Sequence, residues 1–129
     1  MPLLLDTSVA IALRDGHPHI LDRVAELTTS PQLSVITVVE LHGGVVRDQD
    51  PAQQRRRALD RMVQNFNVLA FGFDEAVAYG RIVAALGFSR RGIIDRMIAA
   101  QALVARATVA TLNARDFREI PDLQIEDWS

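Results

Sequence analysis

The chain has 129 residues, a size that suits one domain with a single hydrophobic core. It contains neither cysteine nor lysine, which excludes disulfides, thiol nucleophiles and mechanisms that need a lysine at a phosphate group. Its net charge of -2 at pH 7 argues against a protein that coats nucleic acid through its overall field. Any contact with nucleic acid therefore depends on local clusters of arginine.

Apolar stretches are short and are interrupted by charged residues. None approaches the roughly 20 residues that a membrane span needs. The stretch from Met1 to Leu5 is too short for the apolar region of a signal peptide and has no basic flank. We therefore expect a cytoplasmic protein with no membrane partner.

Apolar runs typical of strands alternate with segments of helical periodicity along the whole chain. The strands are expected over residues 3–5, 33–36, 68–71, 109–112 and 123–126. The helices are expected over residues 9–13, 20–27, from 37, from 51, 74–86 and 94–105. This alternation predicts an α/β fold in one domain over residues 1–129, with a central, mostly parallel sheet between two layers of helices.

Several of the expected helix starts carry capping signals. Thr37 and Glu40 have the spacing of a capping box, and they would open a helix that the Gly43-Gly44 pair weakens or ends. The pair Asp50-Pro51 predicts another helix start, because proline is favoured at the first helical position. Asp74 is expected to cap a further helix.

Four acidic residues stand where an apolar run ends or a helix begins: Asp6, Glu40, Asp95 and Asp116. In sheets of this kind the ligand site lies at the carboxyl ends of the strands. The first expected strand places Asp6 at that edge, and the other three stand in first turns or loops that could reach it. Any one of them alone could be a helix cap. Together they suggest one site for a hard divalent cation.

Four short motifs contain these acidic residues: Leu4-Leu5-Asp6-Thr7-Ser8, Thr37-Val38-Val39-Glu40-Leu41, Asp95-Arg96-Met97-Ile98-Ala99-Ala100 and Thr111-Leu112-Asn113-Ala114-Arg115-Asp116-Phe117. In this order and approximate spacing they resemble the motifs of PIN-domain nucleases. Within that family the chain is most similar to the VapC ribonuclease toxins of bacterial toxin–antitoxin pairs. The resemblance covers essentially the whole length.

The resemblance implies that Asp6, Glu40 and Asp95 hold Mg²⁺ or Mn²⁺, with Asp6 and Asp95 as the direct ligands. Such ions prefer oxygen ligands and can activate bound water for attack on a phosphodiester. The resemblance further implies RNA cleavage that leaves 5′-phosphate and 3′-hydroxyl ends, a homodimer, and neutralisation by a cognate VapB-like antitoxin. Many members of the family have an aspartate where this chain has Asn113. Asp116 could compensate, so the fourth acidic position stays open between these two residues.

Polar residues beside these acids have either a supporting or a purely structural role. Thr7 and Ser8 are expected as caps in a first helical turn, and they could also orient Asp6 or a bound water. Thr111 and Asn113 either belong to the site or form only a turn.

The arginines gather in two clusters along the chain. Arg90 and Arg91 lie shortly before Asp95, where either a phosphate contact or plain solvation fits them. The cluster 55–57 favours a solvated helix face over an RNA contact. The segment 17–19 has two histidines, but it lacks the paired spacing of zinc ligands.

Other classes of protein fit the sequence less well. Response-regulator receivers and haloacid-dehalogenase phosphatases ordinarily need a lysine beside the phosphoryl group, and a dinucleotide-binding domain needs a glycine-rich motif after its first strand. The chain has neither. The remaining alternative is a catalytically inactive PIN-like module that binds RNA or protein.

Overall fold

The computed structural model describes residues 1–47 and 52–129. Within these ranges five strands form one sheet: β1 (Leu3–Leu5), β2 (Gln32–Ser34), β3 (Asn67–Leu69), β4 (Thr108–Thr111) and β5 (Gln124–Asp127). Every neighbouring pair is parallel, in the order β3-β2-β1-β4-β5. The chain leaves β1 toward β2 and later returns to the other side of β1 as β4. The carboxyl ends of β1 and β4 therefore flank the switch point at which ligands bind in such sheets.

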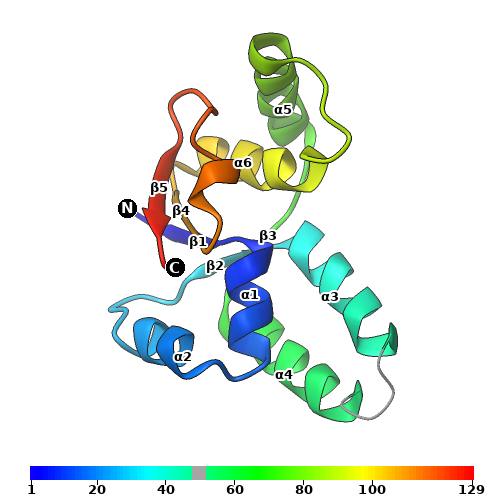
Figure 1. Cartoon of the computed structure of the whole chain (residues 1–129), viewed down its shortest axis with the longest axis vertical. Helices are drawn as coiled ribbons and strands as arrows, with labels where there is room; N and C mark the ends of the chain where they lie inside the picture. Colours follow the sequence, from blue (N-terminus) through cyan, green and yellow to red (C-terminus); the bar gives the residue numbers. More distant parts are fainter. Residues whose placement is uncertain (48–51) are drawn as a thin grey trace.

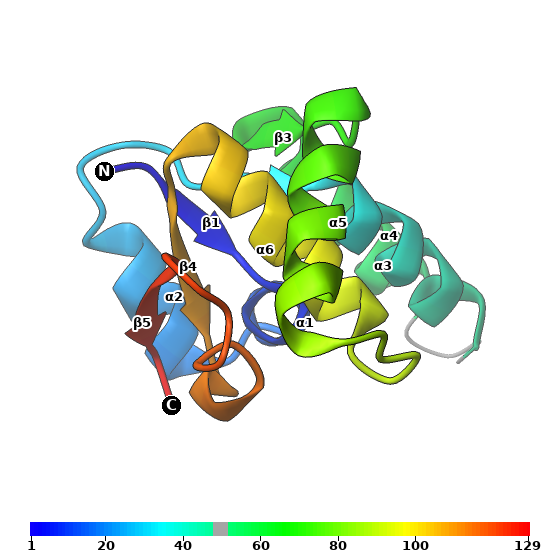
Figure 2. The same cartoon turned by 90° about the horizontal axis from the view of Figure 1, so that it is seen from above.

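Helices cover both faces of this sheet, as Figures 1 and 2 show. The helices are α1 (Thr7–Arg14), α2 (Pro18–Ala25), α3 (Val35–Arg47), α4 (Ala52–Asn65), α5 (Phe73–Leu86) and α6 (Ile93–Ala105), with a short 3-10 helix η1 (Ala114–Asp116). α1, α2 and α4 lie on one side of the sheet, and α5 and α6 lie on the other. This arrangement confirms the predicted α/β fold. No helix in the described ranges is both long and apolar enough to span a bilayer.

Successive residues of the central strands face opposite layers of helices. Leu4 is in register with Val109, and both belong to the cluster formed with α5 and α6. Leu5 is in register with Ala110, and both pack with Val9 in the cluster formed with α1 and α2. Because both faces of the sheet are buried, its strands can be apolar at every position, which explains the continuous apolar run 3–5.

A buried glutamine joins α6 to the sheet. The Gln101 amide nitrogen donates to the carbonyl oxygens of Leu69 and Ala70, at 3.0 Å each, and its amide oxygen accepts a short hydrogen bond from the Ser34 hydroxyl. Both groups of the amide are therefore satisfied, as a buried polar side chain requires. These bonds attach α6 to the carboxyl ends of β2 and β3, which positions the first turn of α6 at the same edge of the sheet.

The start of α3 differs from the sequence prediction. α3 begins at Val35, so Thr37 lies inside the helix and the predicted capping box is wrong. The Ser34 hydroxyl, directly before the helix, accepts instead from the backbone N–H of Ile36 at 3.0 Å. The expected strand 33–36 consequently ends two residues early.

The glycine pair was expected to weaken or end α3, and the second alternative is wrong, because the helix continues through Gly43 and Gly44 to Arg47. A glycine in a helix interior costs about 1 kcal/mol relative to alanine. The buried side chain of Leu41 packs in a cluster with α1 and α4, and this tertiary contact favours the continued helix.

The start of α5 needs a smaller correction. The cap position is Gly72, whose backbone N–H donates to the Glu75 carboxylate at 3.1 Å. Asp74 lies in the first turn, where a negative charge interacts favourably with the helix dipole. The helix start predicted at Asp50-Pro51 lies outside the described residues.

Candidate active site

Asp6 is a buried carboxylate at the carboxyl end of β1. It is the N-cap of α1, with one carboxylate oxygen accepting from the Val9 backbone N–H at 2.9 Å and from the Ser8 hydroxyl at 2.6 Å. The other oxygen accepts from the Thr111 hydroxyl at 2.6 Å. Only 2% of the residue is exposed, and burial raises the pKa of Asp6 even though these hydrogen bonds act in the opposite direction.

Two hydroxyls around Asp6 join the ends of β1 and β4. Besides donating to Asp6, the Ser8 hydroxyl accepts from the Leu112 backbone N–H at 3.1 Å. The Thr111 hydroxyl likewise accepts from the Asn113 backbone N–H at 2.9 Å. Thr111 thus touches the candidate acid directly, whereas the backbone of Asn113 forms the turn that follows β4.

Glu40 is held at the rim of the site by a chain of hydroxyl groups. The Thr7 hydroxyl donates to the Glu40 carboxylate at 2.9 Å, and it also lies 2.9 Å from the Thr37 hydroxyl. Since the only proton of Thr7 goes to Glu40, Thr37 must be the donor to Thr7. Thr37 is fully buried and Glu40 is exposed, so this chain connects the core to the surface.

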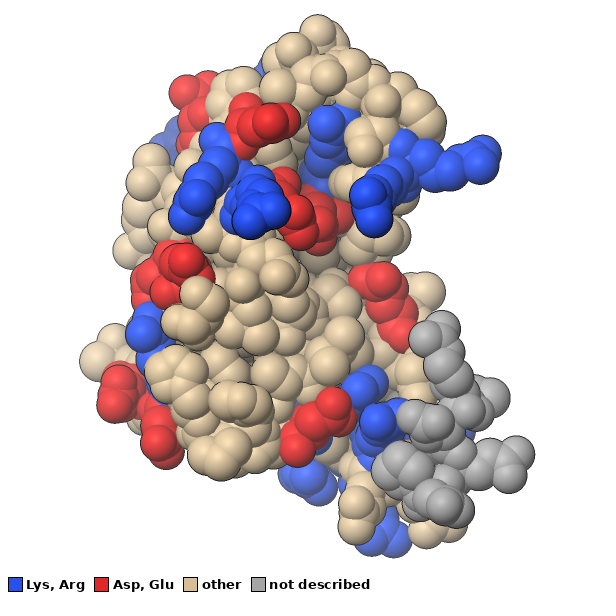
Figure 3. Space-filling view, viewed as in Figure 1, with Lys and Arg blue, Asp and Glu red and all other residues tan. Residues whose placement is uncertain are grey.

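Asp95 and Asp116 line one cavity of about 330 Å³. Asp95 lies in the first turn of α6 and Asp116 lies in η1, after β4. Arg91, Arg96 and Arg115 line the same cavity. Figure 3 shows acidic side chains within a notch on this face, with basic side chains along its upper border.

The four predicted acids interact electrostatically at this edge of the sheet. Burial, together with the negative charges of Asp6, Asp116 and Glu40, raises the pKa of Asp95 to about 6. Within residues 1–47 and 52–129, no three acidic or histidine side chains are arranged closely enough to hold one metal ion. As donors, carboxylate oxygens suit Mg²⁺ or Mn²⁺, and the mutual repulsion of these carboxylates is what a divalent cation would neutralise.

The other sequence candidates lie at varying distances from these acids. Arg91 lines the cavity, whereas Arg90 is an exposed residue of the loop between α5 and α6. The Arg96 guanidinium donates to the Gly87 carbonyl and so attaches that loop to α6. His17 and His19 lie beyond the last turn of α1, at the opposite end of that helix from Asp6.

Sequence reasoning missed Thr37, Arg96 and Arg115 as members of this site. Arg96 and Arg115 each neighbour a candidate acid in the sequence, and that adjacency was a usable signal. Thr37 has a signal as well, but its spacing to Glu40 is that of a capping box and predicts a different role. Its contact with Thr7 joins residues that are 30 positions apart.

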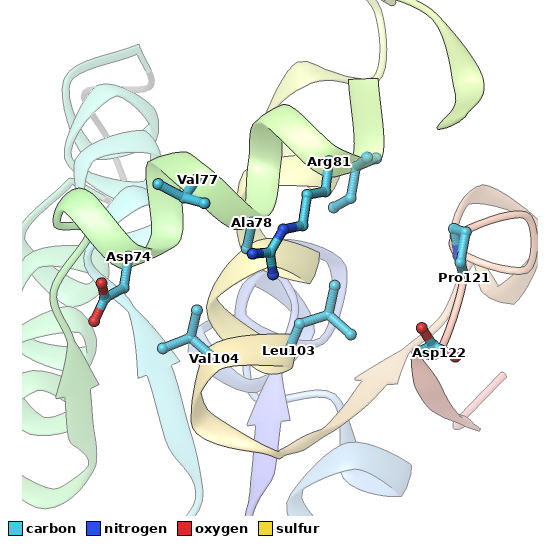
Figure 4. Close-up of a pocket in the computed structure, with 9 residues that line it drawn as sticks. Asp74, Val77, Ala78, Arg81, Leu103, Val104, Pro121 and Asp122 are labelled. Atoms are coloured by element: carbon cyan, nitrogen blue, oxygen red, sulfur yellow. The ribbon is translucent and has the colours of Figure 1, made fainter. Parts of the chain in front are cut away.

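Another cavity, of about 480 Å³, lies between α5 and α6 away from these acids (Figure 4). Val77 and Arg81 of α5 and Leu103 and Val104 of α6 line it. Leu103 is about 12 Å farther along α6 than Asp95, at a rise of roughly 1.5 Å per residue. This cavity therefore contains none of the candidate site residues.

Comparisons with known proteins agree with this geometry. The model of the PIN domain family matches residues 3–123 of the chain. Ribonuclease VapC1 of Haemophilus influenzae (strain R2866) is 34% identical, over 100% of this chain and 99% of that protein. The tRNA(fMet)-specific endonuclease VapC of Salmonella typhimurium is 30% identical, over 99% of this chain and 98% of that protein. A chain of the crystal structure of DNA-bound VapBC from Salmonella typhimurium superposes with a TM-score of 0.87 at 30% identity, covering 100% of this chain and 99% of that chain.

The raised pKa of Asp95 predicts that the metal-free protein loses stability as the pH rises from about 4 to 6. The folded state holds this proton more tightly than the unfolded state does, so ionisation in that window favours unfolding. A shift of about two units corresponds to roughly 3 kcal/mol, which partial exposure reduces to about 1–2 kcal/mol. Asp95→Asn should therefore raise the free energy of unfolding by that amount at pH 7, and by little at pH 4, in urea titrations with chelator present.

Asp74→Asn is the matched control, because Asp74 also occupies a first helical turn and the substitution removes the same favourable contact with a helix dipole. It lies outside the acidic site and should not stabilise the protein. Equal free energies of unfolding for the two variants at pH 7 would show that repulsion at Asp95 is negligible.

Proposed function

This chain belongs to the PIN domain family and, within it, to the VapC ribonucleases, and we propose that it cleaves RNA with Mg²⁺ or Mn²⁺ at the four carboxylates. The observation that carries this proposal is the convergence of three negative charges on Asp95, at the switch point of the parallel sheet. Such a concentration of carboxylates destabilises a fold unless it has a positively charged ligand. We also propose that the protein acts on RNA in the cytoplasm.

Asp6 and Asp95 are the proposed direct ligands, and Glu40 at the rim would contact the cation through a bound water, which Mg²⁺ usually retains. When bound, the cation neutralises charge on the phosphate and activates the attacking water. Ser8 and Thr111 hold the carboxylate of Asp6 in one orientation. Supporting hydrogen bonds of this kind typically matter by a factor of 10 to 100 in affinity or activity.

Asp116 rather than Asn113 is proposed for the fourth acidic position. Asp116 lines the same cavity as Asp95 and contributes to its raised pKa, whereas the backbone of Asn113 bonds to Thr111. Arg91 and Arg115 on the wall of this cavity are suited to contact the RNA phosphates, because guanidinium can form two parallel bonds to a phosphate.

A VapB-like antitoxin is the proposed protein partner, since the Salmonella structure that this chain resembles is a VapBC. The chain is also proposed to form a homodimer. The cavity in Figure 4 is the surface that supports this proposal: Val77 and Val104 on its wall are 39% and 43% exposed. Asp74 and Arg81 lie beside them, and opposite charges on one patch can pair across a two-fold axis.

The first test is metal dependence. Purified protein should cleave structured RNA when Mg²⁺ or Mn²⁺ is present, and EDTA should abolish cleavage reversibly. Mass spectrometry of the products should find 5′-phosphate and 3′-hydroxyl ends. Cleavage that survives chelation, or ends with 2′,3′-cyclic phosphate, would contradict the proposed mechanism. Metal-dependent binding without any cleavage would favour the inactive binding module.

A second test ranks the carboxylates by their effect on kcat/KM. Loss of a metal ligand removes several kcal/mol of transition-state stabilisation, so Asp6→Asn and Asp95→Asn should each reduce kcat/KM about 100-fold or more. Glu40→Gln should come close, and Asp116→Asn should keep partial activity. The control Asp22→Asn, an exposed substitution on α2 outside these surfaces, should be unchanged. Near-normal cleavage by Asp95→Asn would remove the central residue of the proposed site.

The third test addresses the homodimer. Val77→Glu and Val104→Glu should each convert a dimer to a monomer in sedimentation velocity, because a buried unpaired charge is costly at an interface. Val63→Glu is the matched control, since Val63 is 41% exposed on α4, away from this cavity. If all three variants and the wild type sediment alike, this surface is not the dimer interface.

A further inference from the structure

A basic trough leads away from the candidate site along α1 and α4. One cavity, of about 270 Å³, contains Thr7 and Glu40 at one end and Arg14 and Arg55 at the other. A second cavity, of about 550 Å³, contains the same two arginines and extends to Arg57 and Arg61. The two cavities share Arg14 and Arg55 and so adjoin each other. We call them together the α1–α4 trough.

The trough is positively charged although the chain as a whole is negative. Asp15 is the acidic residue that lines its wider part, and it lies 3.0 Å from the Arg14 guanidinium and 3.8 Å from that of Arg55. Arg57 and Arg61 have no carboxylate within salt-bridge distance among the described residues. Both side chains are exposed, so a polyanion can reach them from solvent. Basic side chains are visible below the notch in Figure 3.

The spacing of these arginines suits a chain of phosphates. Arg57 and Arg61 are four residues apart on one face of α4, which places their Cβ atoms about 6 Å apart. α1 rises about 10 Å from Thr7 to Arg14. Arginines that lie this far apart can contact different phosphates of one strand.

We propose that the α1–α4 trough binds the backbone of the RNA strand on one side of the scissile phosphate. This inference rests on the proposed function, because it assumes that the strand enters the acidic site. Glu40 and Thr7 line the nearer cavity of the trough, which favours a strand that is already held at that site. Repeated arginines favour repeated phosphates, which each guanidinium can contact with two parallel hydrogen bonds. Contacts to phosphate raise affinity without reading sequence.

The test measures binding of RNA without cleavage, so it does not depend on catalysis. In the Asp95→Asn background, fluorescence anisotropy would follow a labelled single strand of about 20 nucleotides, longer than one typical binding groove covers. Arg57→Gln and Arg61→Gln should each weaken binding about three- to tenfold. Each should also reduce the slope of log Kd against log salt by about 0.7, the value for one phosphate contact on a single strand.

Arg56→Gln is the matched control, because Arg56 is an exposed neighbour on α4 that does not line the trough. It changes the net charge equally and should weaken binding less than twofold. A dinucleotide held at the acidic site is too short to reach Arg57 at the far end of the trough, so Arg57→Gln and the control should bind it alike.

Equal effects of Arg56→Gln and Arg57→Gln on the long strand would overturn the inference, because the field of the whole helix would then explain the binding. Unchanged RNA affinity in Arg57→Gln and Arg61→Gln, with loss of binding to an acidic antitoxin segment, would also overturn it and assign the trough to a protein. Absence of metal-dependent cleavage in the wild type is a separate result. It would refute the proposed function, but the comparison of RNA affinity among the arginine variants could still be interpreted.

Discussion

The buried carboxylate of Asp6 is the constraint on which this edge of the molecule depends. An ionised group with 2% exposure is costly unless hydrogen bonds replace its lost water. Here the Ser8 hydroxyl, the Val9 backbone N–H and the Thr111 hydroxyl provide them. The same bonds cap α1 and join the end of β1 to the end of β4. The need to satisfy one charge thus fixes the course of two chain segments, and the second continues directly into η1, where Asp116 lies.

The remaining acids lie close enough to one another that their negative charges repel. Asp95 would be stable as a simple first-turn carboxylate of α6, but three other negative charges raise its pKa to about 6. Elsewhere the structure satisfies its polar groups closely, as the bonds of Gln101 illustrate. Functional sites often keep charges that repel one another although the rest of the fold is well satisfied. Their chemistry needs these charges, even though the repulsion lowers stability.

The arginines are distributed unevenly over the surface and gather beside the acidic site. The chain has a net charge of -2, yet arginines line the cavity beside Asp95 and also the α1–α4 trough beyond Glu40. The acidic site, which repels a polyanion, therefore lies between two groups of arginines that attract one: those beside Asp95 and those of the α1–α4 trough. Screening limits such fields to about 10 Å in ordinary buffers, so this local order matters more for a bound strand than the net charge does.

The sequence by itself determined the alternation of strands and helices and, through it, the parallel sheet. It also indicated a possible cap at Asp6 and selected the four acids, because each stands where an apolar run ends or a helix begins. Tertiary structure decided what depends on distant contacts. Ser34 both bonds to Gln101 and precedes α3, so α3 starts earlier than its capping pattern predicts. Thr37 reaches the site through Thr7, 30 residues away. Arg56 and Arg57 are alike in sequence, but the packing of α4 on the core turns only Arg57 toward the trough. No local pattern contains that information, because it depends on which face of the helix is buried.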